Sequence, residues 1–328
     1  MATTETTDGS GPRARPAVAV RPLREEDVPA ADRIMRLAFG TFLGLPEPLA
    51  FGGDAAHVQP RWRADPMATL GAEVGGELVG SNVATNWGSV GFFGPLTVRP
   101  DLWDQGVATQ LLEATMAYFD AWGTTHAGLF TFPQSARHLH LYQKFDFWPR
   151  FLTPIMVKPV VTEGQTPTWT GYAGLAEGER AAALHACREL AEAVYPGLDL
   201  TREIHAADDQ GLGDTVLVWD TTRLLAFAVC HAGPGSEAGT GTCYIKFGAA
   251  RPGPEAGAHF DRLLAACEAL AVGQGAARLV AGVNMGCHEA YLRLLARGFR
   301  TDMEGIAMQR RNDAGYHRPG VYVIDDWR

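Results

Sequence analysis

Apolar residues in the first half of the chain occur in short blocks or at helical spacing, and the two patterns alternate. The short blocks predict strands at residues 18–23, 70–74, 78–85, 90–98, 127–132 and 151–158. Helical spacing predicts helices after the acidic segment 24–27, over 106–119 and over 136–144. Gly75 and Gly76 predict a hairpin turn, and the Gly- and Pro-rich segment 44–66 predicts an irregular or short helical insert.

The second half repeats this order of elements about 150 residues later, after the polar segment 159–168. Helices are predicted at residues 181–194, 257–272 and 287–297, and strands at 214–219, 223–231, 243–247, 277–283 and 306–310. Two helix ends also echo each other, since Tyr142 and Tyr291 each lie in a helix that is followed by an aromatic residue after a turn. The chain is therefore expected to be a doubled α/β (α+β) protein.

Length and composition narrow the class of protein. The 328 residues are enough for two domains, and 46% hydrophobic with 20% charged residues is typical of soluble globular proteins. The net charge of −9 argues against nucleic acid or an anionic membrane as the main partner and is compatible with an amine substrate. No apolar run approaches the roughly 18 residues that span a bilayer, so we expect a cytoplasmic protein. Residues 1–15 lack the apolar core of a secretory signal and are expected to form a disordered leader.

The number and spacing of the cysteines argue against a disulfide-rich protein and against a zinc site. The number of cysteines is odd, no two of them form a CxxC pair, and all lie in the second half: Cys187, Cys230, Cys243, Cys267 and Cys287. We therefore expect buried free thiols and no disulfide framework. Because no ligand spacing matches a zinc site, no metal is expected.

A strand, a short polar turn and a long helix follow one another at residues 96–112. Gly106 and Ala108 lie at the end of the turn, where small side chains allow close approach to the backbone. Several backbone N–H groups and the positive end of the helix dipole then point at one place. A pyrophosphate is the ligand expected there, and the strand-turn-helix context makes the motif more specific than an isolated pair of glycines.

This turn and the order of elements resemble the GNAT superfamily of acetyl-CoA-dependent N-acetyltransferases, in a tandem two-domain form. The family's pyrophosphate loop, Arg/Gln-x-x-Gly-x-Gly/Ala, corresponds here to Trp103-Asp104-Gln105-Gly106-Val107-Ala108. Trp103 replaces a polar residue of the family, which affects one side-chain contact but not the backbone donors. The resemblance implies an N-terminal domain at 16–158, a linker at 159–168 and a degenerate C-terminal domain at 169–328. Each domain is expected to have a mixed, mostly antiparallel central sheet flanked by helices.

The resemblance also implies which residues form the site. Acetyl-CoA is the expected co-substrate, bound by Leu96, Thr97 and Val98 along the pantetheine arm and by Asp104, Gln105, Gly106, Val107, Ala108 and Thr109 at the pyrophosphate. Tyr142 lies in the family's Leu-Tyr-x-Lys-x-x-Phe segment and is expected to protonate the CoA thiolate as it leaves. Ser135 stands where many relatives have a cofactor-binding Asn, and Asp146 where they usually have Gly.

Some candidates keep more than one interpretation. His138 lies one helical turn before Tyr142, so it either orients the tyrosine, contacts the cofactor or is a structural histidine. Three aromatic residues either line the acceptor pocket or pack in the core: Trp87, Phe92 and Phe93.

The general base is open at this point. Glu73 is one candidate, because in this family its strand faces the acceptor side. The carboxylate at the end of the chain is another, because in some multi-domain relatives it reaches the first active site. The tail 321–328 is apolar and aromatic enough to dock. The plain alternative is that the tail packs as an edge strand.

The corresponding loop of the second half is expected to be degenerate. Pro252 and Pro254 lack the N–H groups that an anion site needs. Glu255 adds a negative charge, and His259 replaces a small residue. We therefore expect the second half to bind no CoA productively, to cover the first domain and to complete the acceptor pocket, with Tyr291 in the core.

The sequence thus predicts an N-acetyltransferase that moves an acetyl group from acetyl-CoA to a primary amine by direct attack, with the chemistry in the first domain. The acceptor is a small molecule or a peptide amine, and a homodimer is compatible with the sequence. One alternative is a non-catalytic acyl-CoA-binding sensor or scaffold. Another is the tandem synthase that acetylates a cysteinyl thiol precursor in actinobacteria. In that family the intact loop lies in the second half, whereas here it lies in the first.

Overall fold

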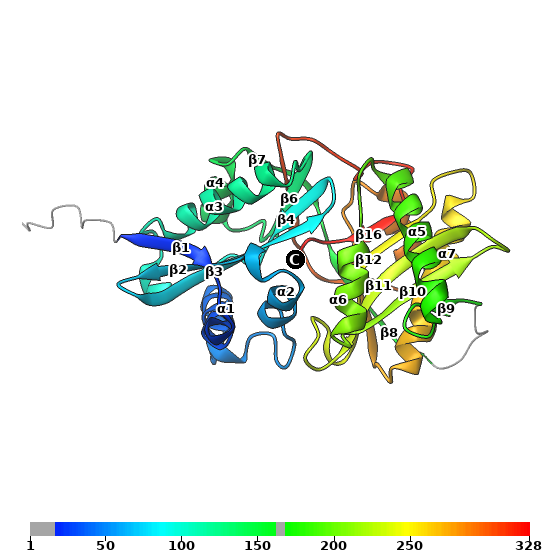
Figure 1. Ribbon diagram of the computed structural model, residues 1–328, viewed down its shortest axis with the longest axis horizontal. Coiled ribbons are helices and arrows are strands. Elements are labelled where there is room, and N and C mark those ends of the chain that lie inside the picture. Colours follow the sequence, from blue (N-terminus) through cyan, green and yellow to red (C-terminus); the bar gives the residue numbers. More distant parts are fainter. Residues whose placement is uncertain (1–16, 162–167) are drawn as a thin grey trace, which may run out of the picture.

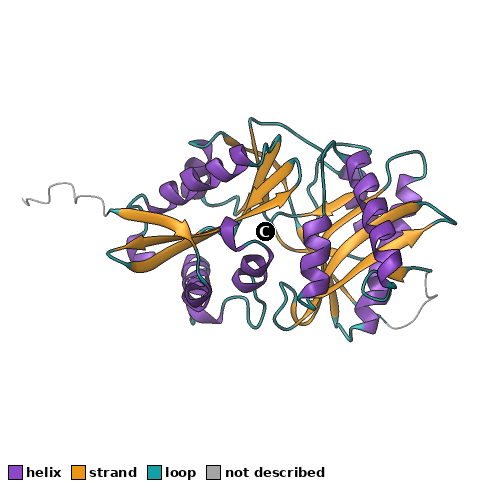
Figure 2. Ribbon diagram, in the orientation of Figure 1, coloured by secondary structure: helices purple, strands orange, loops and turns teal. Residues whose placement is uncertain are grey.

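Two mixed sheets form the framework of the computed structural model, which describes residues 17–161 and 168–328. Figure 1 shows the sheets side by side along the long axis, each with helices packed against it. Each sheet has eight strands, most of which run antiparallel to their neighbours. The expected α/β (α+β) architecture of two sheets flanked by helices is confirmed (Figure 2).

The first sheet has the strand order β1-β2-β3-β4-β6-β15-β7, and the short β5 pairs with β3. Helices α3 and α4 lie on one face, and α1 and α2 on the other (Figure 1). The strands that come from the first half are β1 Val18–Pro22, β2 Thr69–Val74, β3 Glu77–Trp87, β4 Val90–Phe93, β5 Thr97–Val98, β6 His126–Thr131 and β7 Phe147–Leu152. The helices are α1 Val28–Phe42, α2 Val58–Ala64, α3 Val107–Ala121 and α4 Ala136–Gln143.

The second sheet has the strand order β14-β8-β13-β12-β11-β10-β9, and β16 pairs with β12. Its strands are β8 Ile155–Pro159, β9 Thr170–Gly171, β10 Gly213–Trp219, β11 Leu224–Gly233, β12 Gly239–Ala250, β13 Arg278–Gly282, β14 Arg300–Met303 and β16 Val323–Asp325. The helices of this half are α5 Glu177–Val194, α6 Thr201–Asp209, α7 Ala256–Gly273 and α8 His288–Ala296. The remaining strand, β15 Ile306–Arg310, belongs to the first sheet.

The two sheets exchange one strand each. β15 comes from the second half of the chain but lies between β6 and β7 of the first sheet. β8 comes from the first half but lies between β13 and β14 of the second sheet. The expectation of one strand over 151–158 is therefore wrong, because this segment is the end of β7 in one sheet and most of β8 in the other. The expected domain boundary at residue 158 does not separate the two sheets, because each sheet takes one strand from the other half of the chain.

The first sheet opens where the chain bends at Gly94-Pro95. β4 pairs in parallel with β6 from Val90 to Phe93, whereas β5 leaves β6 and pairs with β3. The single strand expected over 90–98 is thus two strands with a bend between them. We call the divergence of β5 and β6 the first fork.

The second sheet has a matching divergence, which we call the second fork. β12 pairs in parallel with β13 over 242–245 and then pairs with β16 over 247–249. A bridge joins Val283, just after β13, to Asp325 of β16. The tail of the chain therefore lies between the two diverging strands, with Ile324 fully buried. The tail is docked, but inside the sheet and not at its edge.

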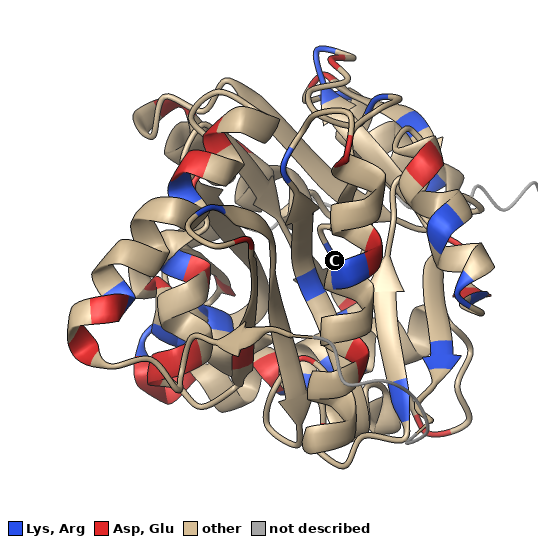
Figure 3. Ribbon diagram, turned by 90° about the vertical axis from the view of Figure 1, so that its right-hand side faces the viewer, with Lys and Arg blue, Asp and Glu red and all other residues tan. Residues whose placement is uncertain are grey.

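Buried charged side chains join the two halves. Arg61 of α2 lies 2.6 Å from Glu237, and Lys246 of β12 lies 2.6 Å from Glu237 and 2.9 Å from Glu203. Trp87 Nε1 of the first sheet donates to Glu203 at 3.0 Å. Because all five side chains are buried, loss of one partner would leave another without an opposite charge or a hydrogen bond. Along the ribbon in Figure 3, acidic and basic residues are interspersed over the helices and loops.

The cysteines bear out the expectation of free thiols, since all five are unpaired and buried. Within residues 17–161 and 168–328, no helix combines the length and the apolarity that crossing a bilayer requires. In the same ranges, no three His, Cys, Asp or Glu side chains gather as metal ligands. The expected leader and residues 162–167 of the expected linker lie outside the described residues.

Candidate active site

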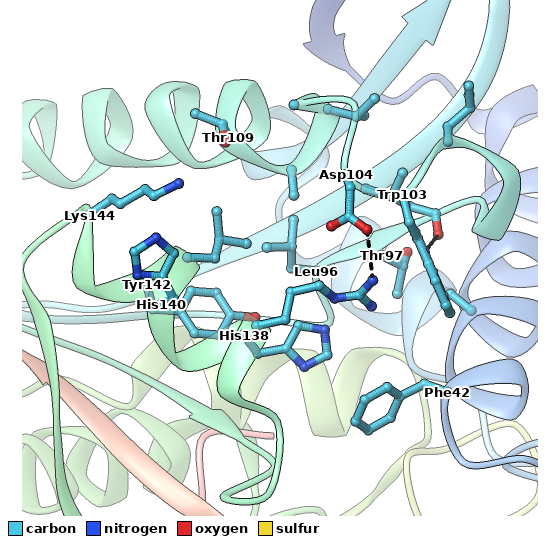
Figure 4. A pocket seen from close by; sticks show the side chains of 18 of the residues that line it. Phe42, Leu96, Thr97, Trp103, Asp104, Thr109, His138, His140, Tyr142 and Lys144 are labelled. Atoms are coloured by element: carbon cyan, nitrogen blue, oxygen red, sulfur yellow. Dashed lines mark hydrogen bonds and ion pairs between the residues drawn. The ribbon is translucent and has the colours of Figure 1, made fainter. Parts of the chain in front are cut away.

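A groove of about 380 Å³ lies at the first fork, between the start of α3 and α4 (Figure 4). Ten of the expected site residues line it: Leu96, Thr97, Val98, Asp104, Gly106, Val107, Ala108, Thr109, His138 and Tyr142. The side chains of Gln105 and Ser135 are engaged elsewhere. Gln105 Nε2 donates to the Asp101 carbonyl at 3.0 Å, and Ser135 Oγ caps α4 by accepting from the backbone N–H of His138 at 3.5 Å.

The first turn of α3 presents backbone donors to this groove. Gly106, immediately before the helix, has a left-handed φ of 88°, and Asp104 has a φ of 63°. The first N–H groups of a helix have no acceptor within the helix, and no side chain caps this end of α3. Because Val107, Ala108 and Thr109 all line the groove, the amides and the helix dipole favour an anion there. This is the geometry that the turn motif predicted.

Trp103 and Arg137 form the rim of the groove above the fork. Trp103 Nε1 donates to the Val98 carbonyl at 2.7 Å, so the residue that departs from the family pattern secures the turn to β5. The Arg137 guanidinium lies 4.6 Å from the centroid of the Trp103 ring, and its Nη1 lies 3.5 Å from Asp104 Oδ2. The pairing of Asp104 with the α4 side chain is drawn in Figure 4. The rim thus carries an exposed cation, Arg137, that is held by a still more exposed carboxylate.

Tyr142 is buried on the wall of the groove, with 7% of its surface exposed. Burial raises the pKa of its hydroxyl well above the ordinary value of 10, and the Thr131 side chain opposes part of this rise. The phenol is therefore protonated throughout the neutral range. The hydroxyl thus carries the proton that the expected role requires, although the raised pKa also makes it a weaker acid.

His138 lies beside Tyr142 and also lines the groove. The two ring centroids are 6.4 Å apart, and the His138 ring lies 5.0 Å from that of Phe42 on α1. Burial, and to a lesser extent the charge of Arg137, lowers the pKa of His138, so the imidazole is neutral. Its Nδ1 is buried without a hydrogen-bond partner among the described residues.

A second cavity, of about 310 Å³, opens on the other side of Tyr142. It shares four lining residues with the groove: Phe39, Leu96, His138 and Tyr142. Its other walls are mainly apolar, from Met35, Leu43, Phe51, His57, Phe93, Gly94, Pro95, Phe130, Thr131, Phe132, Met303, Trp327 and Arg328. Met303, Trp327 and Arg328 come from the second half, so that half completes the cavity.

Basic side chains are the charged side chains that line this apolar cavity, and the main-chain carboxyl oxygen of Arg328 lies there too, where it accepts from Arg61 Nη2. Arg328 lines it and is held by Asp326, with Nε 3.2 Å from Oδ2. His57 lines it too, and burial lowers the pKa of His57 to about 3. Behind the wall, Arg61 Nη1 donates to the carbonyl of Gly94 at 2.6 Å. Among the described residues that line the cavity, none has a carboxylate side chain.

Glu73 lies outside both cavities. Its Oε1 accepts from Arg21 Nε at 2.9 Å, and Arg21 also pairs with Asp27 at 2.6 Å. The carboxylate is thus bound to a guanidinium on the outer strands β1 and β2. The structure does not bring Glu73 to Tyr142, and its expected place on the acceptor side is wrong.

The other open candidates divide between cavity and core. Phe93 lines the apolar cavity, whereas Trp87 and Phe92 are buried in the core between the two sheets. Asp146 has a left-handed φ of 66°, the conformation for which the family usually has Gly. Tyr291 packs against the core of the second sheet, as expected.

The loop before α7 corresponds to the turn before α3. Side chains cover it in a way that its sequence did not indicate. The guanidinium of Arg293 packs directly over Gly257, in the first turn of α7, and pairs with Asp261. Arg293 also lies 5.6 Å from the centroid of the Tyr322 ring, which belongs to the tail. Side chains and the tail therefore fill the place that corresponds to the groove at the first fork.

Sequence reasoning missed several residues that line the groove. Arg137, Leu141 and Lys144 follow helical spacing on α4, and this face was a usable signal. Phe39 and Phe42 carried no such signal, because their place depends on how α1 packs against α4. His140 is exposed and lies at the edge of the groove (Figure 4).

Comparison with known families shows that residues 36–147 match the acetyltransferase (GNAT) family. The matched range begins in α1 and ends at the start of β7, so it includes the first fork, α3 and Tyr142. No curated protein matches the chain.

Solved structures share the fold over almost the whole chain. A candidate acetyltransferase from Pyrococcus horikoshii has a TM-score of 0.66 at 14% identity, covering 94% of this chain and 95% of its own. A GCN5-related N-acetyltransferase from Sphaerobacter thermophilus has a TM-score of 0.56 at 14% identity, covering 91% and 96%. A region of a fungal multi-domain β-N-acetylglucosaminidase, described as a GCN5-related glucosamine N-acetyltransferase, has a TM-score of 0.59 at 11% identity, covering 90% and 38%. The first two likenesses extend over both sheets.

Proposed function

The first half of the chain carries a GNAT acetyltransferase domain, and from this premise we propose that the protein transfers an acetyl group from acetyl-CoA to a primary amine at the first fork. The observation that carries the proposal is that the groove and the apolar cavity meet at Tyr142. A cofactor in the groove and an amine in the cavity approach this residue from opposite sides. Direct transfer requires two substrates that are held in this way.

The groove has the donors that an acyl-CoA needs. The free amides at the start of α3 can bind the pyrophosphate. The cations Arg137 and Lys144 at the rim can pair with the remaining phosphate group of the cofactor. Leu96, Thr97 and Val98 extend along the length where a pantetheine arm would lie. The bound cofactor supplies the activated thioester, and the chain supplies its position.

The reaction itself needs few protein groups. The amine nitrogen forms a bond to the thioester carbonyl carbon, and the carbon–sulfur bond breaks. The Tyr142 hydroxyl gives its proton to the departing thiolate, and the proton lost by the amine passes to solvent, from which the phenolate is restored. The products are an N-acetylated amine and free CoA, so charge and atoms balance. Tyr142 is the group for which burial keeps the proton in place at neutral pH.

We assign no general base among the side chains. Glu73 is bound to Arg21 away from both cavities. His57, whose pKa burial lowers to about 3, and His138, whose pKa is also lowered, are weak bases. The other candidate from the sequence, the carboxylate at the end of the chain, belongs to Arg328, which lines the apolar cavity and accepts from Arg61 through its main-chain oxygen.

The two alternatives are less well supported. A sensor or scaffold has no use for a buried proton donor between two cavities. A thiol-precursor synthase of the kind that uses its second half would need an open second fork, whereas β16 and Arg293 fill it.

The test combines binding with thiol release. Calorimetry with acetyl-CoA should give one site per chain, and free thiol should appear when an amine is added. Ala108→Glu places a carboxylate at the start of α3 and should weaken acetyl-CoA by at least roughly tenfold, and Ala108→Gln, of the same size, by less. No binding, two sites per chain, or binding that never yields thiol with any amine would overturn the proposal.

A further inference from the structure

The tail of the second half places a tryptophan at the acceptor side of the proposed reaction. Trp327 follows β16, lines the apolar cavity beside Tyr142 and has 3% of its surface exposed. We propose that Trp327 is a specificity-determining residue, whose indole closes one end of the cavity and limits the size of the amine that reacts. This inference rests on the proposed function, because it takes the cavity to be the acceptor side.

The indole fills a place that the first sheet leaves empty. Side chains two residues apart on a strand point to the same face, so Gly128 and Phe130 of β6 share one face. Phe130 lines the cavity, whereas Gly128 has no side chain, and the Trp327 ring packs directly against its backbone. Phe92, the partner of Gly128 on β4, stacks on the indole with ring centroids 6.4 Å apart and planes at 14°. The indole therefore stands beside Phe130, where the cavity would otherwise continue along β6.

A chain of buried hydrogen bonds holds the indole in this place. Trp327 Nε1 donates to Tyr316 Oη at 3.3 Å, and the Tyr316 hydroxyl donates to Asp325. The other Asp325 oxygen lies 2.8 Å from His317 Nε2, and His317 Nδ1 lies 2.7 Å from Gln309 Nε2 on β15. All five side chains are buried, where a lost hydrogen bond is costly. Because β15 belongs to the first sheet, these bonds fix the tail to the sheet that carries the site.

The backbone of Trp327 has a conformation that a bulky residue rarely adopts. Its φ of 54° lies in the left-handed region. Such a conformation persists where the surrounding structure fixes it, and it is concentrated at functional sites. Before this residue, β16 pairs with β12. After it, the Arg328 N–H donates to Asp326 Oδ1 at 3.0 Å, and a main-chain oxygen of Arg328 accepts from Arg61. These contacts keep the strained residue and its ring at the wall of the cavity.

The limit that Trp327 sets concerns the body of the acceptor. Tyr142 lines both the groove and the cavity, so the reacting nitrogen has to lie near it, and the rest of the amine extends into the cavity. Trp327 lines the cavity but not the groove, so its size acts on the acceptor and not on the cofactor. Its one polar group is bound to Tyr316, and the indole therefore offers the cavity apolar surface.

The first experiment measures acceptor size in variants of Trp327. Thiol release at saturating acetyl-CoA is compared within two pairs of primary amines, hexylamine with decylamine and 2-phenylethylamine with 2-(1-naphthyl)ethylamine. Trp327→Ala should raise the ratio of kcat/KM for the larger amine to that for the smaller by at least about tenfold. Trp327→Phe should raise this ratio by less, because Phe fills more of the place. The acetyl-CoA dissociation constant should stay within about twofold in both variants. An unchanged ratio in both variants, or an equal loss with the larger and the smaller amine, would overturn the inference.

Tyr316→Phe tests the chain of hydrogen bonds without changing a residue that lines the cavity. The substitution removes the hydroxyl that accepts from Trp327 and donates to Asp325. A less firmly held indole should admit the larger amines, so we expect the same ratio to rise by about two- to fivefold. A lower urea midpoint with an unchanged ratio would show a purely structural role and would overturn the role of these bonds in placing the wall.

Trp62 provides a matched control. Its Nε1 also donates a hydrogen bond, to the Leu23 carbonyl at 3.0 Å, and it lines neither cavity. Trp62→Ala should leave the ratio within about twofold of the unchanged protein. A shift as large as that of Trp327→Ala would show that loss of any indole loosens the site, and the inference would be wrong.

Binding and turnover in the unchanged protein separate the two proposals. If acetyl-CoA fails to bind, or if no primary amine releases thiol, the proposed function fails and the inference fails with it. If other primary amines react but neither pair does, or if the ratio is the same in Trp327→Ala, the proposed function stands and Trp327 does not limit the acceptor.

Discussion

The two forks of this molecule begin alike and end differently. In the first, β5 and β6 diverge and leave a groove of about 380 Å³ that is lined by backbone and small side chains. In the second, β12 and β13 diverge and β16 pairs with β12 in the gap. Diverging strands expose backbone donors and acceptors, which must be satisfied by something. Such a fork is therefore open to a ligand only where no other part of the chain already satisfies its backbone donors and acceptors.

The helix that follows each fork repeats this contrast. The start of α3 has no side-chain cap and opens into the groove. At the start of α7, Arg293 packs over Gly257 and pairs with Asp261. An anion can therefore approach one helix end and not the other, although both helices follow a sheet strand in the same order.

The largest expected effect separates the two tyrosines that occupy similar places in the halves. Tyr142→Phe removes the proton donor at the open fork without changing the volume of the side chain. We expect kcat to fall by roughly 10²–10⁴-fold while the acetyl-CoA dissociation constant stays within about twofold. Steady-state kinetics and calorimetry measure the two quantities. Loss of affinity together with rate would mean that the hydroxyl only supports the groove.

Tyr291→Phe is the matched control, because Tyr291 packs against the core of the second sheet. It should leave kcat within about twofold of the unchanged protein. Equal loss of activity in both variants would break the distinction between an active and a closed half.

A second prediction concerns stability at the closed fork. Ile324 of β16 is fully buried, so Ile324→Ala should reduce the free energy of unfolding by about 2–4 kcal/mol. At the open fork, Leu96→Ala removes a partly buried side chain and should cost about 1 kcal/mol or less, but it should weaken acetyl-CoA. Urea unfolding and calorimetry test both. If Ile324→Ala is as mild as Leu96→Ala, the tail is not the core of the second fork.

Local sequence was enough to predict the turn that opens into the groove. The turn around Gly106 places its donors through the backbone of a few consecutive residues, so its conformation depends little on the rest of the fold. The position of Tyr142 followed from the family pattern. The elements themselves were also placed well, because the spacing of apolar residues reflects which face is buried.

Non-local pairing was what the sequence did not reveal. β8 and β15 are ordinary apolar strands, and nothing in their residues states that each belongs to the other half's sheet. The insertion of the tail between β12 and β13 depends on a partner more than 70 residues away, as the pairing of Phe247 with Asp325 shows. Arg293 over Gly257 likewise results from the packing of α8 on α7.

A third prediction concerns pH and the junction between the halves. Burial lowers the pKa of His126 and of His231 to about 4; the described residues offer the His231 ring no hydrogen-bond partner, and the nearest carboxylate to His126 is that of Asp313, with Oδ2 3.6 Å from Nδ1. Both are neutral in the folded protein but take up a proton below about pH 6.5 when unfolded. Stability is therefore fully present above pH 6.5, falls as the pH decreases toward 4, and loses roughly 1–3 kcal/mol for each histidine.

Urea midpoints measured between pH 7.5 and pH 4.5 test this, with the prediction that His231→Gln reduces the slope. His185→Gln is the control, because the His185 side chain is 71% exposed. Its profile should match that of the unchanged protein. A midpoint that does not change down to pH 5 would place protonation sites elsewhere.

The smallest effect is expected at the rim of the open fork, where Arg137 and Asp104 pair at 3.5 Å in the absence of ligand. Phosphate groups and Asp104 would compete for the same guanidinium, so the two substitutions should act in opposite directions. Arg137→Gln should weaken acetyl-CoA by about two- to fivefold, and more at low salt than at high salt. Asp104→Asn should strengthen it by about twofold, because Asn also tolerates the left-handed φ of 63° and preserves the turn. Weaker binding by Asp104→Asn would instead show that this carboxylate maintains the backbone donors, and the open fork would then depend on a side chain as the closed one does.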